Sequence, residues 1–515
     1  MEALQGVIAA CLFFGVIHTY IRFRYASQPP LPPGPRPLPL LGNFLSMPSR
    51  LDWLTYMDWA KQHNTDVLYL NVLGQPMLVV DTYEACTELL EKRSALYSTR
   101  PQLTMIELMG WDFSVALMPY ARNRRRCRRL LHEYIGNQPT ANAQTQPLVV
   151  RSVCTFLRRM LNAKSDGLKA ELHHMVGRII LETAYGIVPK PANDPYIAIG
   201  DAAANSLVRA TQPGAYLVNI FPALKHFPGW FPGASFKGQA REWRGLARAL
   251  AEGPFADVKS KLAHCAPPSL ASIALSKATS DEEEHDIRDA SATLYGAGLD
   301  TVSRREEFLV SILRKPAITL HLQTMCSRAL QHALVPGQLP TLEDEQRLPY
   351  TTAVVLESLR YRPIAPQGFP HLYTGSEADL YHGYTIPKGT VVMQNIWSMT
   401  RDETTYPDPD TFKPERFLTA DGALDPTVRN PCDIVFGFGR RVCPGIHLAY
   451  TTLWLTAACT LRTYTISKTN RQDGSVVEPS SDLVSVGVTM KPADYGCIFT
   501  RQDKQARTML EALEI

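Results

Sequence analysis

The segment that most restricts what this chain can fold into is FGFGRRVCPG, residues 436–445. Three glycines surround Cys443, and the apolar stretch from 446 to 463 has the pattern of a helix. Glycines let the backbone approach a flat ligand and leave amide N–H groups free to point at the sulfur. Those amides and the nearby helix N-terminus favour a thiolate over a thiol. Arg441 adds a cation that can hold a carboxylate of the ligand. This segment therefore predicts a loop that presents a thiolate to a bound group.

The same loop matches a longer signature. It resembles the haem-binding loop of the cytochrome P450 family, F-x-x-G-x-R-x-C-x-G, with Phe436, Gly439, Arg441, Cys443 and Gly445 in place. The resemblance implies haem b as the cofactor and Cys443 as the axial thiolate ligand of its iron. It also implies that Phe436, Gly439 and Arg441 contribute to cofactor binding.

Further segments resemble the same family in the same order along the chain. Glu357 and Arg360 in LESLRYRP, with Arg416 in FKPERF, are similar to the structural triad of the family. His371 follows Pro370, at a position where many relatives hydrogen-bond a haem propionate. The resemblance implies that the triad supports the fold and that His371 binds the cofactor.

The segment GAGLDTVS, residues 296–303, lies in a stretch with helical character. A glycine inside a helix costs about 1 kcal/mol relative to alanine, so Gly298 needs a specific reason. The segment resembles the oxygen-handling A-G-x-D/E-T motif of the family. Thr301 and Asp300 are therefore expected to be catalytic and to relay protons during oxygen activation.

The residues that follow depart from the family pattern. Relatives usually have a second hydroxyl residue and then an apolar helix, whereas this chain continues with charged residues at 304–307. Loss of one residue rotates everything downstream by about 100° of helix, so these charges are expected to face the core. Three explanations stay open: a local helix bulge, an error in the gene model, or a partial loss of activity.

An arginine run, RNRRRCRRL, occupies residues 122–130. The net charge of the whole chain is only +4, which argues against nucleic acid as a partner. The run resembles the family helix that carries W-x-x-x-R. Arg128 matches that arginine and is expected to bind a haem propionate, whereas Arg124 stands in place of the tryptophan. The neighbours Arg125, Arg126 and Arg129 are expected to form a basic surface for an acidic reductase domain.

The body of the chain predicts a mainly α fold with small β-sheets, an α+β class that agrees with the cytochrome P450 fold. Strands are expected near 66–81, 379–395 and 483–499, and most of 82–335 favours helix. With 45% hydrophobic and 20% charged residues, the chain can bury a large core. The ten cysteines are scattered, which is typical of free thiols in a reducing compartment.

The first residues favour a membrane anchor. Residues 4–21 carry no acidic or basic side chain apart from His18, and a helix of that length spans about 27 Å. Arg22 and Arg24 follow it, so the positive-inside rule predicts a single-pass transmembrane helix in the endoplasmic reticulum membrane with the rest in the cytoplasm. A cleaved signal peptide is the alternative. The expected organisation is an anchor at 1–21, a proline-rich hinge at 22–43 and a catalytic domain at 44–515.

The resemblance implies a haem-thiolate monooxygenase of the fungal microsomal type. Such an enzyme inserts one atom of O2 into an apolar small molecule, by hydroxylation or epoxidation, in secondary metabolism or xenobiotic oxidation. Electrons are expected from NADPH through a separate NADPH–cytochrome P450 reductase, with cytochrome b5 as a further candidate donor, because no dinucleotide or FMN fingerprint occurs in the chain. The alternatives are an oxygen-independent isomerase or dehydratase and a catalytically impaired pseudoenzyme. Candidate pocket residues are Phe113, Gln367 and Val486.

Overall fold

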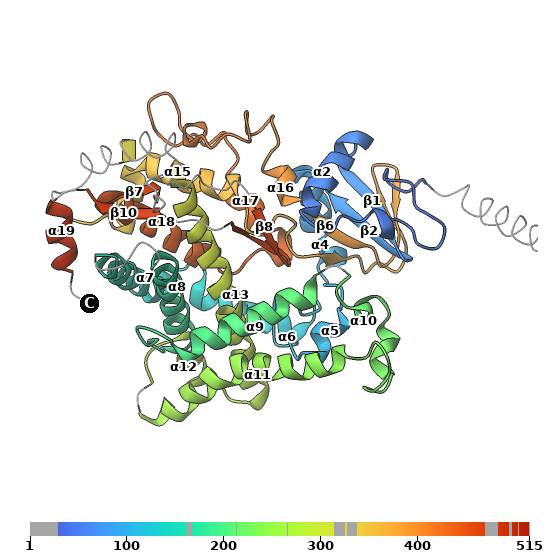
Figure 1. Cartoon of the computed structure of the whole chain (residues 1–515), viewed down its shortest axis with the longest axis horizontal. Helices are drawn as coiled ribbons and strands as arrows, with labels where there is room; N and C mark the ends of the chain where they lie inside the picture. The colour runs from blue at the N-terminus through green and yellow to red at the C-terminus, as the bar shows by residue number, and fades with distance from the viewer. Residues whose placement is uncertain are drawn as a thin grey trace, which may run out of the picture.

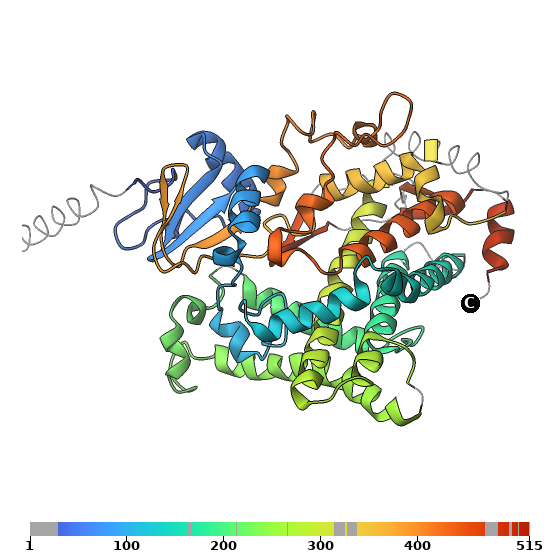
Figure 2. The ribbon, with the colours of Figure 1, turned by 180° about the vertical axis from the view of Figure 1, so that it is seen from behind.

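A helical body and a smaller sheet-rich lobe make up the described structure. The computed structural model describes residues 29–161, 167–212, 214–264, 266–313, 325–326, 337–468, 483–493, 497–502 and 504–513. Figures 1 and 2 show strands β1 (Val67–Val72) and β2 (Gln75–Val80) toward one end of the long axis and helix α19 (Lys504–Glu511) at the other. Helices dominate and the sheets are small, which confirms the predicted fold class.

The largest sheet has four strands in the order β1-β2-β6-β3. Strands β1 and β2 form an antiparallel hairpin, and β2 pairs in parallel with β6 (Val391–Gln394), which in turn pairs antiparallel with β3 (His371–Leu372). The hairpin turn is Leu73 and Gly74, with φ of 53° and 89°, a geometry that matches the twist of the two strands. The prediction of two short strands around Gly74 is therefore confirmed.

The described residues also form three two-stranded sheets. Each is a small antiparallel pair, and two of them lie in the last fifth of the chain. The pairs are β4 (Asp379–Tyr381) with β5 (Tyr384–Ile386), β7 (Tyr464–Lys468) with β10 (Cys497–Arg501), and β8 (Leu483–Val486) with β9 (Thr489–Pro492).

Long helices form the body, and eight of them lie in the described ranges. They are α6 (Arg122–Ile135), α7 (Pro139–Arg159), α8 (Leu168–Tyr185), α9 (Pro195–Thr211), α11 (Phe236–Lys261), α13 (Asp281–Leu313), α15 (Pro349–Tyr361) and α18 (Ile446–Thr463). Shorter helical segments join them, including α2 (Asp52–His63), α3 (Tyr83–Cys86), α4 (Ser94–Tyr97), α5 (Thr104–Leu108), α10 (Leu217–Ile220), α12 (Leu270–Leu275), α16 (Ile396–Met399) and α17 (Cys432–Val435).

Helix α13 is the central element. It has 33 residues and is therefore about 50 Å long. Its first turn is four acidic residues, Asp281–Glu284, which interact favourably with the positive end of the helix dipole. Helices α6, α8, α9, α11 and α18 all pack against it, and the main hydrophobic core lies between these helices. Any chemistry that α13 carries is consequently enclosed on several sides.

The expected membrane anchor, residues 1–21, lies outside the described residues. Within the described ranges, no helix is both long and apolar enough to cross a membrane. The described part of the expected hinge is hydrogen-bonded to the sheet lobe. Tyr69 N donates to Pro33 O at 2.8 Å, and Thr385 N donates to Pro30 O at 2.8 Å. Residues 29–43 are thus held against the lobe.

Candidate active site around Cys443

The loop that carries Cys443 is folded tightly before helix α18 begins. The Cys443 amide donates to Phe436 O at 2.8 Å, which closes the loop on itself. Gly439 has φ of +56°, and a Cβ there would lie 2.1 Å from Leu90 O. This glycine is therefore required by close packing against η2 (Thr87–Lys92), and its contribution to cofactor binding stays a prediction.

The Cys443 side chain is partly exposed, and a backbone amide favours its thiolate as the sequence predicted, although burial opposes this effect. Burial raises the pKa of the Cys443 thiol, whereas the backbone amide of Gly445 and the charge of Arg128 lower it. Burial has the largest effect and favours the neutral thiol over the thiolate. The charge of a bound metal ion deprotonates a coordinating thiol. An iron ion bound at Cys443 would therefore stabilise the thiolate despite the effect of burial.

Four arginines from three separate segments lie around this loop. Arg100, Arg124 and Arg441 are buried, and Arg128 is partly buried. Their guanidinium groups donate to backbone carbonyls: Arg128 to Val442 at 2.7 Å, Arg124 to Arg440 at 3.0 Å, Arg441 to Met118 at 2.7 Å, and Arg100 to Pro370 at 2.8 Å. Among the described residues, none of the four forms an ion pair with a carboxylate.

Burial and mutual repulsion disfavour the charges of these arginines. Burial, followed by the charges of Arg100 and Arg124, lowers the pKa of Arg441 to about 8. Burial lowers the pKa of Arg100 to about 9 and that of Arg124 to about 10. A concentration of buried cations without an anion is costly, so the group that belongs here must be negatively charged.

His371 completes the set. Its Nδ1 lies 2.6 Å from Tyr97 O, and because a carbonyl can only accept, Nδ1 carries the hydrogen. Its Nε2 is buried and has no hydrogen-bond partner among the described residues. Burial and the neighbouring arginines hold the pKa of His371 well below its usual value. An anion beside Nε2 would favour protonation of the ring, so that the Nε2–H of the imidazolium donates to it, and would offset the arginine charges.

Haem b fits these residues. It offers two propionate carboxylates for the arginines and His371, and an iron that takes a thiolate ligand. Accessible space is also present beside the central helix, because Ala297 is exposed and Thr301 is partly exposed although both lie in the middle of α13. The buried cations, the unpartnered His371 nitrogen and this space agree with a flat dianionic group.

The two expected catalytic residues, Asp300 and Thr301, are adjacent on α13, and the side chain of each forms a hydrogen bond within this helix. The Thr301 hydroxyl donates to Ala297 O at 2.7 Å. Asp300 accepts from Arg304 Nε at 2.7 Å. Asp300 therefore already has a cationic partner one turn along the same helix, a contact that sequence reasoning did not foresee.

Gly298 has a packing reason. A Cβ at this position would lie 2.6 Å from Ile180 Cδ1 on α8. The gap that the sequence left unexplained in the helix therefore lets α8 and α13 approach each other.

The charged residues at 304–307 face the interior, as the rotation argument predicted. Arg304, Arg305, Glu306 and Glu307 are 8%, 5%, 0% and 6% exposed. Helix α13 is α-helical through this stretch, so the bulge explanation is wrong. Arg305 donates from Nη1 to Arg362 O and from Nη2 to Ser358 O. Among the described residues, its Nε and both carboxylate oxygens of Glu306 have no hydrogen-bond partner.

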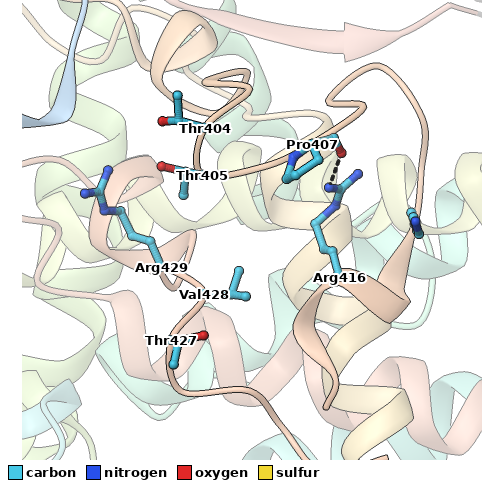
Figure 3. Close-up of a pocket in the computed structure, with 8 residues that line it drawn as sticks. Thr404, Thr405, Pro407, Arg416, Thr427, Val428 and Arg429 are labelled. Carbon is cyan, nitrogen blue, oxygen red and sulfur yellow. Dashed lines mark hydrogen bonds between the residues drawn. The ribbon is translucent and has the colours of Figure 1, made fainter. Parts of the chain in front are cut away.

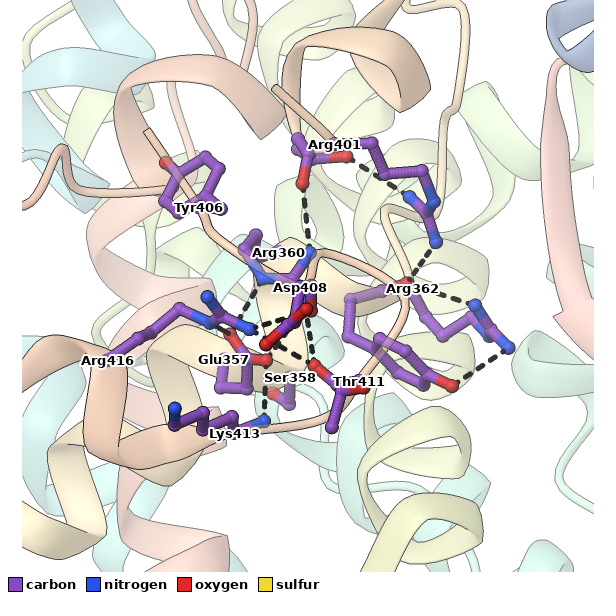
Figure 4. A network of polar contacts seen from close by, with 12 residues as sticks. Glu357, Ser358, Arg360, Arg362, Arg401, Tyr406, Asp408, Thr411, Lys413 and Arg416 are labelled. Atoms are coloured by element: carbon purple, nitrogen blue, oxygen red, sulfur yellow. Dashed lines mark hydrogen bonds and ion pairs between the residues drawn. The ribbon is translucent and has the colours of Figure 1, made fainter. Parts of the chain in front are cut away.

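Glu357 and the two arginines form the expected ionic cluster, shown in Figure 4. Glu357 accepts from Arg360 Nε at 2.7 Å and from Arg416 Nε at 3.2 Å. The backbone N–H of Lys413 donates to the same carboxylate at 2.8 Å, and Arg360 donates to Thr400 O at 2.9 Å. These contacts join α15 to the irregular segment 400–416.

The arginine run divides into groups with different surroundings. Arg126 pairs with Glu282 at 2.7 Å and with Asp286, both on α13. Arg125 and Arg129 are exposed. The basic surface expected from three arginines is therefore carried by two of them, because Arg126 joins α6 to α13.

The three candidate pocket residues lie in different parts of the structure. Phe113 is buried and stacks on Trp111 with ring centroids 5.1 Å apart. Gln367 lies beside Asp52 of α2. Burial raises the pKa of the Asp52 carboxyl, and a hydrogen bond with the Gln367 side chain opposes this rise. The side chain of Val486 lies outside the described part of the structure.

A separate surface cavity of about 580 Å³ lies in the irregular segment that precedes the Cys443 loop. Figure 3 shows its lining, which includes Thr404, Thr405, Pro407, Arg416 and Arg429. Arg416 donates to Pro407 O there and belongs to the Glu357 cluster. None of the expected haem or catalytic residues lines this cavity.

Arg100 is the residue that sequence reasoning missed. It contacts Phe369 O and Pro370 O, immediately before His371, from a position 269 or 270 residues earlier in the chain. Its sequence neighbourhood, STRPQ, carries no chemical signal of its own. Only the folded structure brings this cation to the others.

The cysteine loop, the unpaired arginines and the Glu357 cluster define a haem-thiolate protein. Comparison with known proteins agrees. The family model described as "Cytochrome P450" matches residues 32–497 of the chain. Cytochrome P450 monooxygenase 98 of Postia placenta is 39% identical over 99% of this chain and 96% of its own. Cytochrome P450 monooxygenase ple1 of Rhodocybe pseudopiperita is 35% identical over 94% and 91%, and tryptamine 4-monooxygenase of Psilocybe cyanescens is 34% identical over 97% of both chains.

The chain therefore belongs to the cytochrome P450 family. Its similarity to fungal monooxygenases extends over nearly its whole length, and its enzyme class is that of a cytochrome P450 monooxygenase.

Proposed function

We propose that the monooxygenase reaction of this chain inserts one atom of O2 into an apolar small molecule, by hydroxylation or epoxidation, and releases the other atom as water. The observation that carries the proposal is the set of arginines around the Cys443 loop that have no carboxylate partner among the described residues. Such a set matches a dicarboxylate cofactor with a thiolate-binding metal, and haem b is that cofactor.

When bound, thiolate-ligated haem supplies binding and cleavage of dioxygen. The residues of this chain supply position and protons. The Thr301 hydroxyl, at the accessible face of α13, donates a hydrogen bond and can turn from Ala297 O toward a bound ligand. Asp300, which is partly exposed, connects this face to solvent once its pair with Arg304 opens.

The test is a reconstituted assay with the full chain, a cytochrome P450 reductase and NADPH. The reduced, CO-bound protein should show the red-shifted Soret band of a thiolate complex, and NADPH and O2 should be consumed in step with product. Turnover without NADPH or O2 would overturn the proposal in favour of an isomerase or dehydratase. The presence of Thr301 and Asp300 favours the monooxygenase.

A catalytically impaired protein is the second candidate, and one observation favours it. The Asp300 carboxylate is occupied by Arg304, and the next three residues bring further charges into the core. In that case the CO-bound spectrum would be that of a thiolate complex, but NADPH oxidation would yield peroxide or water instead of product. Arg304→Leu, which frees Asp300, should then raise the yield of product per NADPH.

The substrate class we propose is an apolar or aromatic small molecule, as in fungal secondary metabolism or xenobiotic oxidation. Stacked Trp111 and Phe113 lie close to α13, since Trp111 would contact a Cβ built at Gly296. One relative is named for its action on tryptamine. Product analysis with tryptamine and a terpenoid, polyaromatic and steroid panel tests the class, and turnover confined to charged, non-aromatic compounds would contradict it.

We propose that a separate NADPH–cytochrome P450 reductase docks on the exposed part of α6, with cytochrome b5 as a further candidate. Arg125 and Arg129 support this, because both are exposed cations beside the cofactor-facing arginines. Charge reversal at both positions should raise the KM for reductase and weaken its dependence on salt. Arg241→Glu, an exposed arginine of α11, is the matched control. Equal effects of the two changes would contradict the docking site.

We also propose that residues 1–21 attach the chain to the endoplasmic reticulum membrane. Residues 22–43 then form a hinge, and residues 44–515 form a catalytic domain in the cytoplasm. The apolar residues 4–21 support this proposal, as do exposed Leu40 and Trp230, which are 95% and 81% exposed. Gly42, two residues after Leu40, pairs with Val72 of β1, and Trp230 follows α10 by ten residues. Strand β1 and helix α10 are found toward the same end of the long axis in Figures 1 and 2. Fluorescence of Trp230 should be quenched by brominated phosphatidylcholine vesicles, with Trp230→Phe defining the background; no quenching would contradict this orientation.

A further inference from the structure

We propose that Arg124 raises the reduction potential of the bound haem and so favours acceptance of the first electron. The inference rests on the proposed haem-thiolate function and assigns a role to the one arginine of the set that stands where the family has tryptophan. It concerns a charge effect, which is distinct from simple retention of the cofactor.

Arg124 is one of the largest fully buried side chains of the protein and is 2% exposed. Its Nη2 donates to Arg440 O at 3.0 Å, while its Nε has no hydrogen-bond partner in the part of the chain that the structure describes. Its guanidinium carbon lies 5.2 Å from the centre of the Tyr120 ring. A buried donor left unsatisfied in this way points to an anionic group at the same place.

Charge balance then gives the direction of the effect. Four arginines surround the loop, whereas haem brings two propionate carboxylates, so two guanidinium charges stay uncompensated. Reduction of the iron adds one negative charge to a thiolate-ligated haem that is otherwise neutral apart from its propionates. Uncompensated cations in a poorly hydrated site stabilise that added charge, and removal of one of them lowers the potential.

Arg128 is fixed to the loop by a 2.7 Å hydrogen bond to Val442 O, and Arg441 is fixed to Met118 O by another of 2.7 Å. In the proposed function these two arginines hold the cofactor in place. A tryptophan, the residue typical of the family at this position, is neutral, so Arg124 adds a positive charge that relatives lack here. A neutral side chain with a donor group can replace its hydrogen bond but not its charge, so the two contributions are separable.

The experiment is a spectroelectrochemical titration of the full-chain holoprotein. Arg124→Gln keeps a donor and removes the charge, Arg124→Lys keeps the charge, and Arg125→Gln removes the neighbouring exposed charge on the same helix as a matched control. We expect Arg124→Gln to lower the potential, Arg124→Lys to stay close to the original protein, and Arg125→Gln to give a smaller shift that disappears at high salt.

Equal shifts for Arg124→Gln and Arg125→Gln, or for Arg124→Gln and Arg124→Lys, would overturn the proposal. Haem content and the CO-bound spectrum are recorded for each variant. Arg124→Trp serves as a second neutral variant, with the residue typical of the family. Loss of haem from both neutral variants but not from Arg124→Lys would overturn potential tuning in favour of haem retention. Failure of the unaltered chain to bind haem would instead overturn the proposed function, so the two failures are distinguishable.

Discussion

Arg128 is one of two α6 arginines, with Arg124, that join this helix to the Cys443 loop. Its Nη1 donates to Val442 O at 2.7 Å, and its charge is the one that most strongly favours the Cys443 thiolate. Arg125 lies three residues earlier on the same helix and is exposed. The two residues therefore separate the effect of a cofactor contact from the effect of positive charge in general.

Arg128→Ala should weaken haem retention far more than Arg125→Ala. A lost hydrogen bond to a charged group costs about 1.5–3 kcal/mol, which corresponds to roughly 10- to 100-fold faster loss of haem. The measurement is haem transfer to an acceptor apoprotein, followed by absorbance. Equal transfer rates for the two variants would count against a propionate contact at Arg128.

Glu306 is a residue whose burial predicts a pH dependence of stability. It is 0% exposed, and burial raises the pKa of its carboxyl from 4.5 to about 8, with Arg305 opposing. The unfolded chain therefore releases this proton at lower pH than the folded protein. The contribution of Glu306 to the free energy of unfolding is complete below about pH 4.5 and is lost as pH rises toward about 8.

Glu306→Gln should flatten this part of the pH profile, because the amide does not titrate. Unfolding by urea at a series of pH values between about 5 and 9 measures the slope. Glu84→Gln, at an exposed site, is the control and should leave the slope as it is. An identical slope for Glu306→Gln and the original protein would contradict a neutral buried carboxyl.

At the scale of elements, the contact between α8 and α13 depends on a missing side chain. A Cβ at Gly298 would lie 2.6 Å from Ile180 Cδ1, whereas Gly245 in α11 has open space around it. Both glycines are inside helices and differ only in what they face. They form a matched pair for testing how closely the two helices pack.

Gly298→Val should lower the free energy of unfolding by about 1–3 kcal/mol, because the added methyl groups overpack the helix interface. Gly245→Val should change it by less than about 0.5 kcal/mol, since valine and glycine both have low helix propensity. Urea midpoints at constant slope give both values. A neutral result at Gly298 would indicate that α8 can move away without cost.

At the scale of the whole molecule, the Glu357 cluster connects segments that are far apart in the sequence. It joins α15 to residues around 400–416, which lead to the Cys443 loop. Glu357 and Arg360 are both 0% exposed. Removal of one partner from such a cluster leaves an uncompensated buried charge, which is more costly than loss of the attraction itself.

Glu357→Gln should therefore destabilise the fold by about 3–5 kcal/mol and reduce the yield of haem-loaded protein. Glu88→Gln, which removes the partner of Lys92 and Arg93 nearer the surface, should cost less than about 1 kcal/mol. Thermal unfolding of the two variants side by side measures the difference. Similar melting temperatures would contradict the supporting role of the cluster.

The sequence alone was sufficient for the family, the fold class, the hairpin around Gly74 and the Glu357 cluster. The family and the Glu357 cluster followed from the resemblance of short motifs to those of cytochromes P450, whereas the fold class and the hairpin followed from local patterns of residue types. Burial of residues 304–307 also followed from the helical rotation per residue. These conclusions needed no knowledge of which segments meet in space.

Only the tertiary structure decided the partners of individual side chains. Gly439 faces Leu90, Gly298 faces Ile180, Arg126 pairs with α13, and Arg100 reaches Pro370 from 270 residues away. Likewise, burial outweighs the backbone amide at Cys443. Such contacts depend on which surfaces pack together, and a sequence pattern records the periodicity of one element but not the identity of its neighbour.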